Sequence, residues 1–191
     1  MRFSFRYLFQ SIVLFILFHS LAFASKAPWF FDRYSLEHGL SQTSVTCVVQ
    51  DRKGFVWVGT QGGLNRFDGY QFKIFKSTKN QQPLKANWIT DCAAEREGAI
   101  WLTTATNGLA KFNPENESFT RFHQKNSGLT DNKLWSLHLD NDDNLWIGTE
   151  SKGLIKFNTE LEETEQLVND EHSQSHTSVK MIRDIFQDEQ G

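Results

Sequence analysis

Short apolar runs and polar turns alternate along the chain in an order that returns from repeat to repeat. Each repeat opens with an apolar or β-branched run, at residues 45–50, 88–93, 134–139 and 181–187. An acidic turn follows, and then an apolar triplet centred on tryptophan, VWV, IWL or LWI. A Gly-containing turn leads to LNRF, LAKF or LIKF, and a less regular run closes the repeat at residues 72–76, 119–123 and 165–168. Each full repeat therefore predicts four short strands.

The spacing of the repeats predicts the architecture. The tryptophans of the triplets are 44 and 45 residues apart, and the glycine and phenylalanine that follow them recur every 45 residues. A period of this length, with short strands and a Gly and aromatic signature, is typical of β-propeller blades. The repeated structural positions are Trp57, Gly59, Gly63, Phe67, Trp101, Gly108, Phe112, Trp146, Gly148, Gly153 and Phe157.

The tryptophan triplets also indicate how the sheets pack. A strand with one wet face alternates apolar and polar residues, and these triplets are apolar on both faces. Both faces of each sheet must then be covered, and no helical period lies between repeats to supply the cover. The sequence therefore predicts an all-β fold, a β-propeller of four-stranded antiparallel blades stacked face to face.

The turns between the first and second strands of each repeat are acidic. Asp51 and Gly54 occupy the first and fourth positions of DRKG, as a type I turn favours. Asp140 and Asp188 begin the equivalent turns of later repeats, and EREG at residues 95–98 is the second copy. Asp143 replaces the turn glycine of the third copy, which is tolerable because Asp accepts left-handed geometry.

These boundaries predict about three complete blades in an open, partial propeller. The expected parts are a signal peptide at 1–24, an N-terminal segment at 25–40, blades at 41–83, 84–128 and 129–177, and the start of a fourth blade at 178–191. Residues 31–34 match the outer strand of later repeats, so we expect them to help close the ring with the last blade. The open arc should leave apolar blade faces exposed, so the chain alone should associate or melt with poor cooperativity.

The N-terminus has the features of an export signal. Arg2 and Arg6 precede an apolar run at residues 12–18, and Ala-Phe-Ala ends at Ala24, just before Ser25. We therefore expect cleavage between Ala24 and Ser25, with a retained anchor as the alternative. Loss of this segment changes the formal net charge from −3 to −5, which argues against a nucleic-acid partner.

The two cysteines occupy adjacent positions of the repeat, Cys47 four residues before Asp51 and Cys92 three before Glu95. Side chains at adjacent positions point to opposite faces of equivalent strands. We therefore expect two buried thiols and no disulfide between them.

The stretch GLSQTSVTCVVQDRKGFVWVGTQGGLNRFDGYQFKIF, residues 39–75, closely resembles the first repeats of the two-component regulator propeller family. The resemblance extends over residues 29–191, although Thr103 stands where Gly59 and Gly148 stand in the other repeats, which puts the close packing beside Trp101 in doubt. It implies the periplasmic sensor portion of a bacterial membrane receptor. In that family the blades precede a small β-sandwich domain, a membrane span and a histidine kinase or diguanylate cyclase.

Other groups have a structural interpretation that outweighs a chemical one. The triplet tryptophans could form a stacking platform, but their repetition favours packing between blades. The glycines lead into no helix, which favours hairpin turns over a phosphate loop. Residues 140–144 resemble the start of a calcium loop but lack its later ligands, and His172 and His176 lie in a polar loop. We expect no catalytic, cofactor or metal residues.

Two functions from different classes follow. The first is a sensory module that binds an unknown periplasmic ligand or protein, together with its own further blades and C-terminal domains, and that meets the membrane only through a later span or an uncleaved signal. The second is an enzyme of the streptogramin-lyase type, which also uses propeller repeats. A catalytic histidine or acid pair at a position outside the repeat would distinguish the second from the first.

Overall fold

The computed structural model describes residues 30–75, 88–167 and 180–188. Its contacts divide the chain into Met1–Arg33 and Tyr34–Gly191, and the second part holds all of the strands described here. Within the described residues, no helix has the length and apolar character needed to cross a membrane. The predicted cleavage site at Ala24 and Ser25 lies outside these residues.

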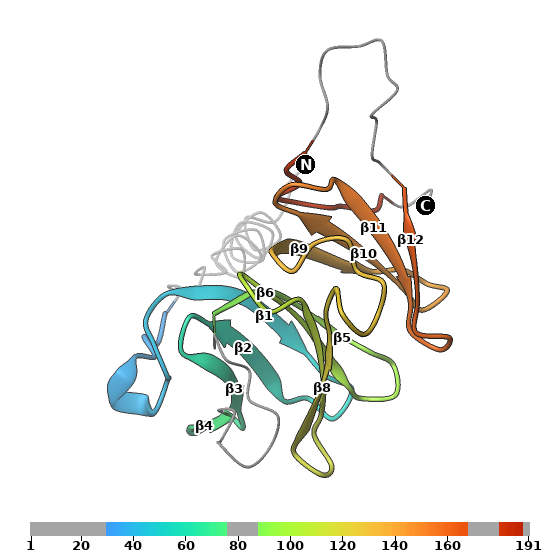
Figure 1. The fold of residues 1–191 in the computed structure, drawn as a ribbon. Coiled ribbons are helices and arrows are strands. Elements are labelled where there is room, and N and C mark those ends of the chain that lie inside the picture. Colours follow the sequence, from blue (N-terminus) through green and yellow to red (C-terminus); the bar gives the residue numbers. More distant parts are fainter. Residues whose placement is uncertain (1–29, 76–87, 168–179, 189–191) are drawn as a thin grey trace, which may run out of the picture. The chain divides into compact units, whose positions relative to one another are not determined.

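Three antiparallel four-stranded sheets, each a blade, make up the described fold (Figure 1). In every sheet the strands pair in the order in which they follow one another along the chain. Blade 1 contains β1 (Val45–Gln50), β2 (Val56–Thr60), β3 (Gly63–Phe67) and β4 (Phe72–Phe75). Blade 2 contains β5 (Ile89–Ala94), β6 (Ile100–Thr104), β7 (Leu109–Asn113) and β8 (Ser118–Phe122). Blade 3 contains β9 (Leu134–Leu139), β10 (Asn144–Thr149), β11 (Leu154–Asn158) and β12 (Glu163–Gln166).

The apolar cores lie between blades. One core joins blades 1 and 2, and in it the ring centroids of Trp57 and Phe112 are 5.5 Å apart. The other joins blades 2 and 3, where Trp101 and Phe157 make the equivalent contact at 5.6 Å. Trp57 and Trp101 thus each meet the phenylalanine of the next blade in a T-shaped contact, and such packing between sheets explains why the central strands are apolar on both faces. The predicted all-β blade architecture is confirmed, and the three sheets do not close into a ring.

The turn after the first strand has the predicted geometry. Gly54 N donates to Asp51 O at 3.0 Å, and Gly54 adopts the left-handed φ of 87° that glycine accepts without strain. The Asp51 carboxylate also accepts hydrogen bonds from the backbone N–H groups of Lys53 and Phe55. In blade 3 Asp143 takes the glycine position with a φ of 59°, as the sequence predicts.

Residues 180–188 lie against blade 3 as β9 lies against blade 2. Gly153 N donates to Lys180 O at 2.9 Å, which matches the bond from Gly108 N to Asn132 O at 2.8 Å one blade earlier. The predicted strand at residues 181–187 is nevertheless not formed. A strand needs a hydrogen-bonded neighbour, and no described strand pairs with this segment.

Residues 30–35 also form no strand, and a short 3-10 helix, η1 (Leu36–His38), follows them. Tyr34 packs edge-on against Phe67 with ring centroids 4.7 Å apart. Closure of the ring by residues 31–34 therefore stays a prediction.

Cys47 and Cys92 form a disulfide, with Cα atoms 5.8 Å apart, so the prediction of two free thiols is wrong. Cys47 lies on the face of β1 that meets blade 2, and Cys92 lies on the face of β5 that meets blade 1. Side chains on opposite faces of equivalent strands point at one another when the sheets are stacked face to face. The bond therefore links the inner strands of blades 1 and 2.

The residue of blade 2 at the position equivalent to Cys47 also bridges to the next blade. Asp91 stands at that position in blade 2, opposite Thr103 as Cys47 stands opposite Gly59. Its carboxylate accepts the backbone N–H of Leu137 in blade 3 at 2.8 Å. A covalent bridge and a hydrogen-bonded bridge thus occupy equivalent places at successive junctions.

Thr103 is accommodated although glycine stands at its position in the other blades. A Cβ on Gly59 would lie 2.4 Å from the sulfur of Cys47, and one on Gly148 would lie 2.7 Å from a backbone oxygen. In blade 2 the equivalent inner residue is Asp91, which turns towards Leu137, and Thr103 is fully buried with its hydroxyl 2.9 Å from that of Thr90. The close packing that the sequence put in doubt beside Trp101 is kept, because Trp101 is also fully buried.

Candidate functional site

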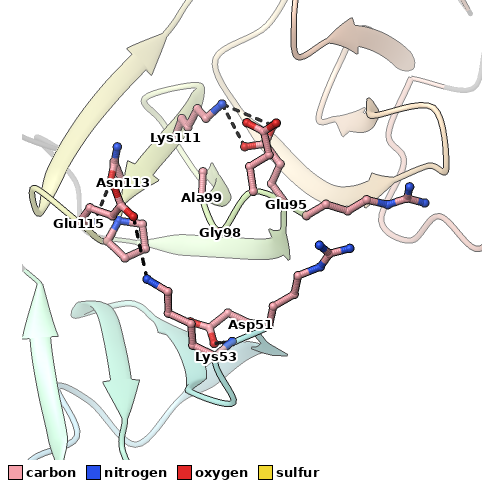
Figure 2. A pocket seen from close by; sticks show the side chains of 12 residues that line it. Asp51, Lys53, Glu95, Gly98, Ala99, Lys111, Asn113 and Glu115 are labelled. Atoms are coloured by element: carbon pink, nitrogen blue, oxygen red, sulfur yellow. Dashed lines mark hydrogen bonds and ion pairs between the residues drawn. The ribbon is translucent and has the colours of Figure 1, made fainter.

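A cleft of about 470 Å³ lies at the junction of blades 1 and 2 (Figure 2). We call it the inter-turn cleft, because turns of both blades line it. Blade 1 contributes residues 51–53, and blade 2 contributes residues 95–99, Lys111 and residues 113–115. The acidic turns and the turn that follows β7 are therefore brought together only when the blades stack.

A partly buried ion pair lines the cleft on the blade 2 side. The Glu95 side chain is 9% exposed, and Lys111 Nζ lies 3.0 Å from its Oε2 and 3.4 Å from its Oε1. Of these two contacts only the longer one has hydrogen-bond geometry. Lys111 also lies over the ring of Trp101, 5.0 Å from a ring centroid. A carboxylate accepts about four hydrogen bonds, so that of Glu95 keeps acceptor capacity.

Blade 2 carries a small residue in the lining of the cleft, at a position where the other blades carry larger ones. Ala99 occupies the position held by Phe55 in blade 1 and Asn144 in blade 3. In blade 3 the Asn144 amide accepts a hydrogen bond from Asn158 at 3.1 Å. The methyl group of Ala99 can form no such hydrogen bond with Asn113, the equivalent of Asn158, and both residues line the cleft.

Blade 2 also differs in how its tryptophan is held. Trp57 Nε1 donates to Asp51 Oδ2, and Trp146 Nε1 donates to Asp140 Oδ2, both at 2.8 Å. Glu95 replaces the aspartate in blade 2, and Trp101 Nε1 is buried without a hydrogen-bond partner among the described residues. A longer side chain at this position carries its carboxylate past the indole and onto Lys111.

The Asp140 carboxylate shows the electrostatic effect of the aspartate arrangement. Burial alone would raise the pKa of Asp140, but hydrogen bonds from Trp146 and Asn144 outweigh burial and hold that pKa below its ordinary value. The aspartate is therefore kept charged in its turn, where it ties the tryptophan to the backbone.

Two arginines flank the cleft from equivalent turn positions. Arg52 follows Asp51 and Arg96 follows Glu95, and both side chains line the same hollow. Neither guanidinium has a hydrogen bond or ion pair to any residue that the structure describes. At the mouth, Lys53 Nζ and Glu115 Oε1 are 4.0 Å apart and join the two blades through an exposed pair.

A second hollow, of about 440 Å³, lies beside blade 3. His138, Asp140 and Trp146 line one side of it, and residues 185–188 line the other. Trp146 is half-buried there, whereas Trp57 and Trp101 are fully buried. At the other two junctions, Phe112 and Phe157 of the following blade pack against the equivalent tryptophans. We therefore interpret this hollow as part of the packing surface of blade 3 and not as a ligand site.

No catalytic constellation can be built from the sequence-predicted positions. The repeated tryptophans, glycines and phenylalanines lie in the strands and hairpins of each blade, one set to a sheet. Among the described residues, no three His, Cys, Asp or Glu side chains gather as a metal site would require. His172 and His176 lie outside the described residues.

Sequence reasoning missed three residues at the inner ends of the blades. Trp88 and Trp135 meet edge-on with ring centroids 6.2 Å apart, and the Arg183 guanidinium lies over Trp135, 4.2 Å from a ring centroid. The available signal was that these two tryptophans fall outside the repeated tryptophan position. Sequence reasoning also missed the cleft, although EREG was visible as the one acidic turn that begins with glutamate.

Comparison with known proteins supports the repeat assignment. Residues 39–62 and 128–151 match the family described as two component regulator propeller. These two stretches begin just before β1 and β9 and end within the hairpins after β2 and β10. The chain carries two-component regulator propeller repeats.

The propeller chain is similar to a curated histidine kinase and to a solved extracellular domain of a two-component system. It is 46% identical over 65 residues to histidine kinase P4 of Formosa agariphila, a match that covers 32% of this chain and 5% of that protein. It is also similar to the extracellular domain of a putative hybrid two-component system of B. thetaiotaomicron, at 25% identity and a TM-score of 0.66 over 73% of this chain and 20% of that one. The propeller chain thus spans a small part of the proteins it matches.

The enzyme alternative has a structural neighbour as well. Virginiamycin B lyase from Staphylococcus aureus is 16% identical, with a TM-score of 0.53 over 67% of this chain and 42% of that one. Identity at this level shows a shared propeller fold and carries no shared activity.

Proposed function

We propose that the chain is the sensory propeller of an exported membrane receptor, which binds a small ligand or a protein outside the cytoplasm and controls an output domain inside. The observation that carries the proposal is the combination of family repeats with the similarity to an extracellular domain of a hybrid two-component system. In this role the propeller itself performs no chemistry. The blades supply a rigid frame on which turns from neighbouring sheets form a binding surface.

The disulfide supports a location outside the cytoplasm. Disulfides persist in oxidising compartments such as the bacterial periplasm, and the Cys47–Cys92 bond joins two inner strands. The N-terminal residues 1–24 would direct export, either cleaved before Ser25 or retained as an anchor. N-terminal sequencing of the protein from membrane and periplasmic fractions separates these outcomes.

The output domain of the complete receptor is proposed to be a histidine kinase, as the named relative suggests, with a diguanylate cyclase as the other outcome. In membranes that contain the complete gene product, the receptor should autophosphorylate in response to an external signal. Deletion of residues 41–188 should leave the kinase present and abolish its response. Cyclic di-GMP synthesis in the same membranes would indicate the cyclase. Lyase activity of the purified chain on virginiamycin B would contradict a purely sensory role.

A further inference from the structure

We propose that the inter-turn cleft binds a small organic anion that also carries a hydrogen-bond donor, such as a hydroxy acid or an amino acid. The inference rests on the proposed sensory role, because it names the class of ligand that the propeller would detect. It is built on the features that distinguish the junction of blades 1 and 2, namely the two arginines, the buried Glu95 and the space above Ala99.

Arg52 and Arg96 supply the anion-binding end. A guanidinium presents paired N–H donors that match the two oxygens of a carboxylate, and these two cations have no partner in the described part of the chain. Adjacent turns bring them to one cleft, whose lining also holds Glu97 and carries four basic and four acidic residues in all. The two arginines are the lining cations without a partner among the described residues, so an anion can bind to them locally. Asn141 stands at the same position in blade 3, so the pair is not a general feature of the repeat.

Asp51 does not cancel this positive charge at close range. Its carboxylate accepts hydrogen bonds from Lys53 N, Phe55 N and Trp57 Nε1, all within its own turn and blade. Glu115 is shared with Lys53 across the mouth at 4.0 Å, an exposed contact that contributes little and can open for a ligand.

Glu95 forms the part of the cleft that would accept a hydrogen bond from the ligand. Its side chain is buried, its one described partner is Lys111, and it lines the same cleft as the arginines. A buried carboxylate gains from each further donor, so a ligand hydroxyl or ammonium group would complete its hydrogen bonds. An anion with such a donor would therefore bridge the rim and the interior of the cleft.

The size of the cleft limits the ligand. Its volume of about 470 Å³ lies near the lower end of small-molecule sites, which span roughly 300–1,000 Å³. This suits a molecule with one or two carboxylates and excludes a polymer held along its length. The cleft is formed by both blades, so an occupant would also hold them together.

The test measures binding to the purified full chain by isothermal titration calorimetry. The probes are malate, glutamate and inorganic sulfate, with malamide as the uncharged counterpart of malate. We expect saturable binding of malate or glutamate and none of malamide. The double variant Arg52→Gln/Arg96→Gln should weaken that binding by about tenfold or more, as expected for the loss of charged hydrogen bonds.

Two further variants separate the cleft from general charge. Lys125→Gln/Lys152→Gln removes the same charge from exposed turns outside the cleft and should leave binding unchanged. Glu95→Gln should weaken malate and glutamate more than sulfate, which is an anion without a hydrogen-bond donor. Absence of saturable binding of all three probes, or equal binding by the arginine double variant, would overturn the inference.

The sensory role is tested separately, in membranes that carry the complete receptor. If malate or glutamate binds the cleft but changes no output, the cleft is a ligand site and the proposed function fails. If the receptor responds to another external signal while the purified chain binds none of the probes, the sensory role holds and the cleft inference fails.

Discussion

Trp57 donates its indole N–H to Asp51 at 2.8 Å, and this bond ties the central strand of blade 1 to the turn that precedes it. The same bond joins Trp146 to Asp140 in blade 3. Blade 2 lacks it, because Glu95 pairs with Lys111 and leaves Trp101 Nε1 without a partner among the described residues. An unpaired buried N–H costs stability that the other two blades do not lose.

Glu95→Asp should therefore stabilise the chain. A shorter carboxylate can accept the Trp101 N–H, and the gain should be about 1 kcal/mol in the free energy of unfolding, reduced by loss of the Lys111 pair. The matched variant Asp51→Glu should destabilise by a similar amount. Urea denaturation of both proteins tests this, and a destabilised Glu95→Asp variant would show that the ion pair outweighs the missing hydrogen bond.

Removal of the disulfide should destabilise the junction of blades 1 and 2. Cys47 and Cys92 are 45 residues apart, and a loop of that length gives about 3–4 kcal/mol in the chain-entropy account. Cys47→Ser, Cys92→Ser and the double variant should lose nearly equal stability, because either change breaks the same bond. Reductant should lower the melting temperature of the parent chain and leave the double variant unaffected.

Asp91 should make the free energy of unfolding decrease as pH rises through the range just above the ordinary aspartate pKa. Burial raises the pKa of the Asp91 carboxyl, and nearby Asp184 adds to the effect, although the backbone N–H groups of Leu137 and Cys92 oppose it. The folded state then binds this proton more tightly than the unfolded state, so its contribution is full at low pH and is lost as pH passes through the raised pKa.

Comparison of the parent with Asp91→Asn at several pH values isolates this effect. The variant should lack the fall in stability that Asp91 causes in the parent. As pH rises, the unfolding free energy of Asp91→Asn should therefore increase relative to that of the parent. Asp140→Asn is the matched control with the opposite sign. Because the pKa of Asp140 is lowered in the folded state, this carboxylate stabilises the fold at pH values above the ordinary aspartate pKa, and the contribution is lost as pH falls through the lowered pKa. A parent and an Asp91→Asn variant with parallel pH profiles would contradict the prediction.

Trp57→Ala should cost about 3–5 kcal/mol in the free energy of unfolding, the range for aromatic truncation in a core. Trp57 is fully buried and contacts Phe75 and Phe112, so its loss leaves a cavity between two blades. Trp146→Ala should cost less, because Trp146 is half-buried beside blade 3. Thermal unfolding measures both. An unchanged melting temperature for Trp57→Ala, with altered ligand binding, would support the stacking-platform interpretation instead.

The sequence by itself determined the blades. The apolar triplets, the turn residues and the 45-residue spacing specify strands and hairpins, because those depend on side chains close together in the chain. The strands β1 and β9 coincide with the predicted runs, and the left-handed turn at Asp143 follows from its residue type. Strand 181–187 is the exception, since pairing requires a neighbour as well as a pattern.

Only the tertiary structure decided what happens between blades. Face-to-face stacking turns opposite faces of equivalent strands towards each other, which converts Cys47 and Cys92 from separate positions into a bonded pair. Glu95, with one methylene more than aspartate, leaves the Trp101 N–H without a hydrogen-bond partner among the described residues, and Glu95 and Ala99 both line the cleft between the blades. These outcomes depend on the distances between atoms of different sheets, which the order of residues along the chain does not state.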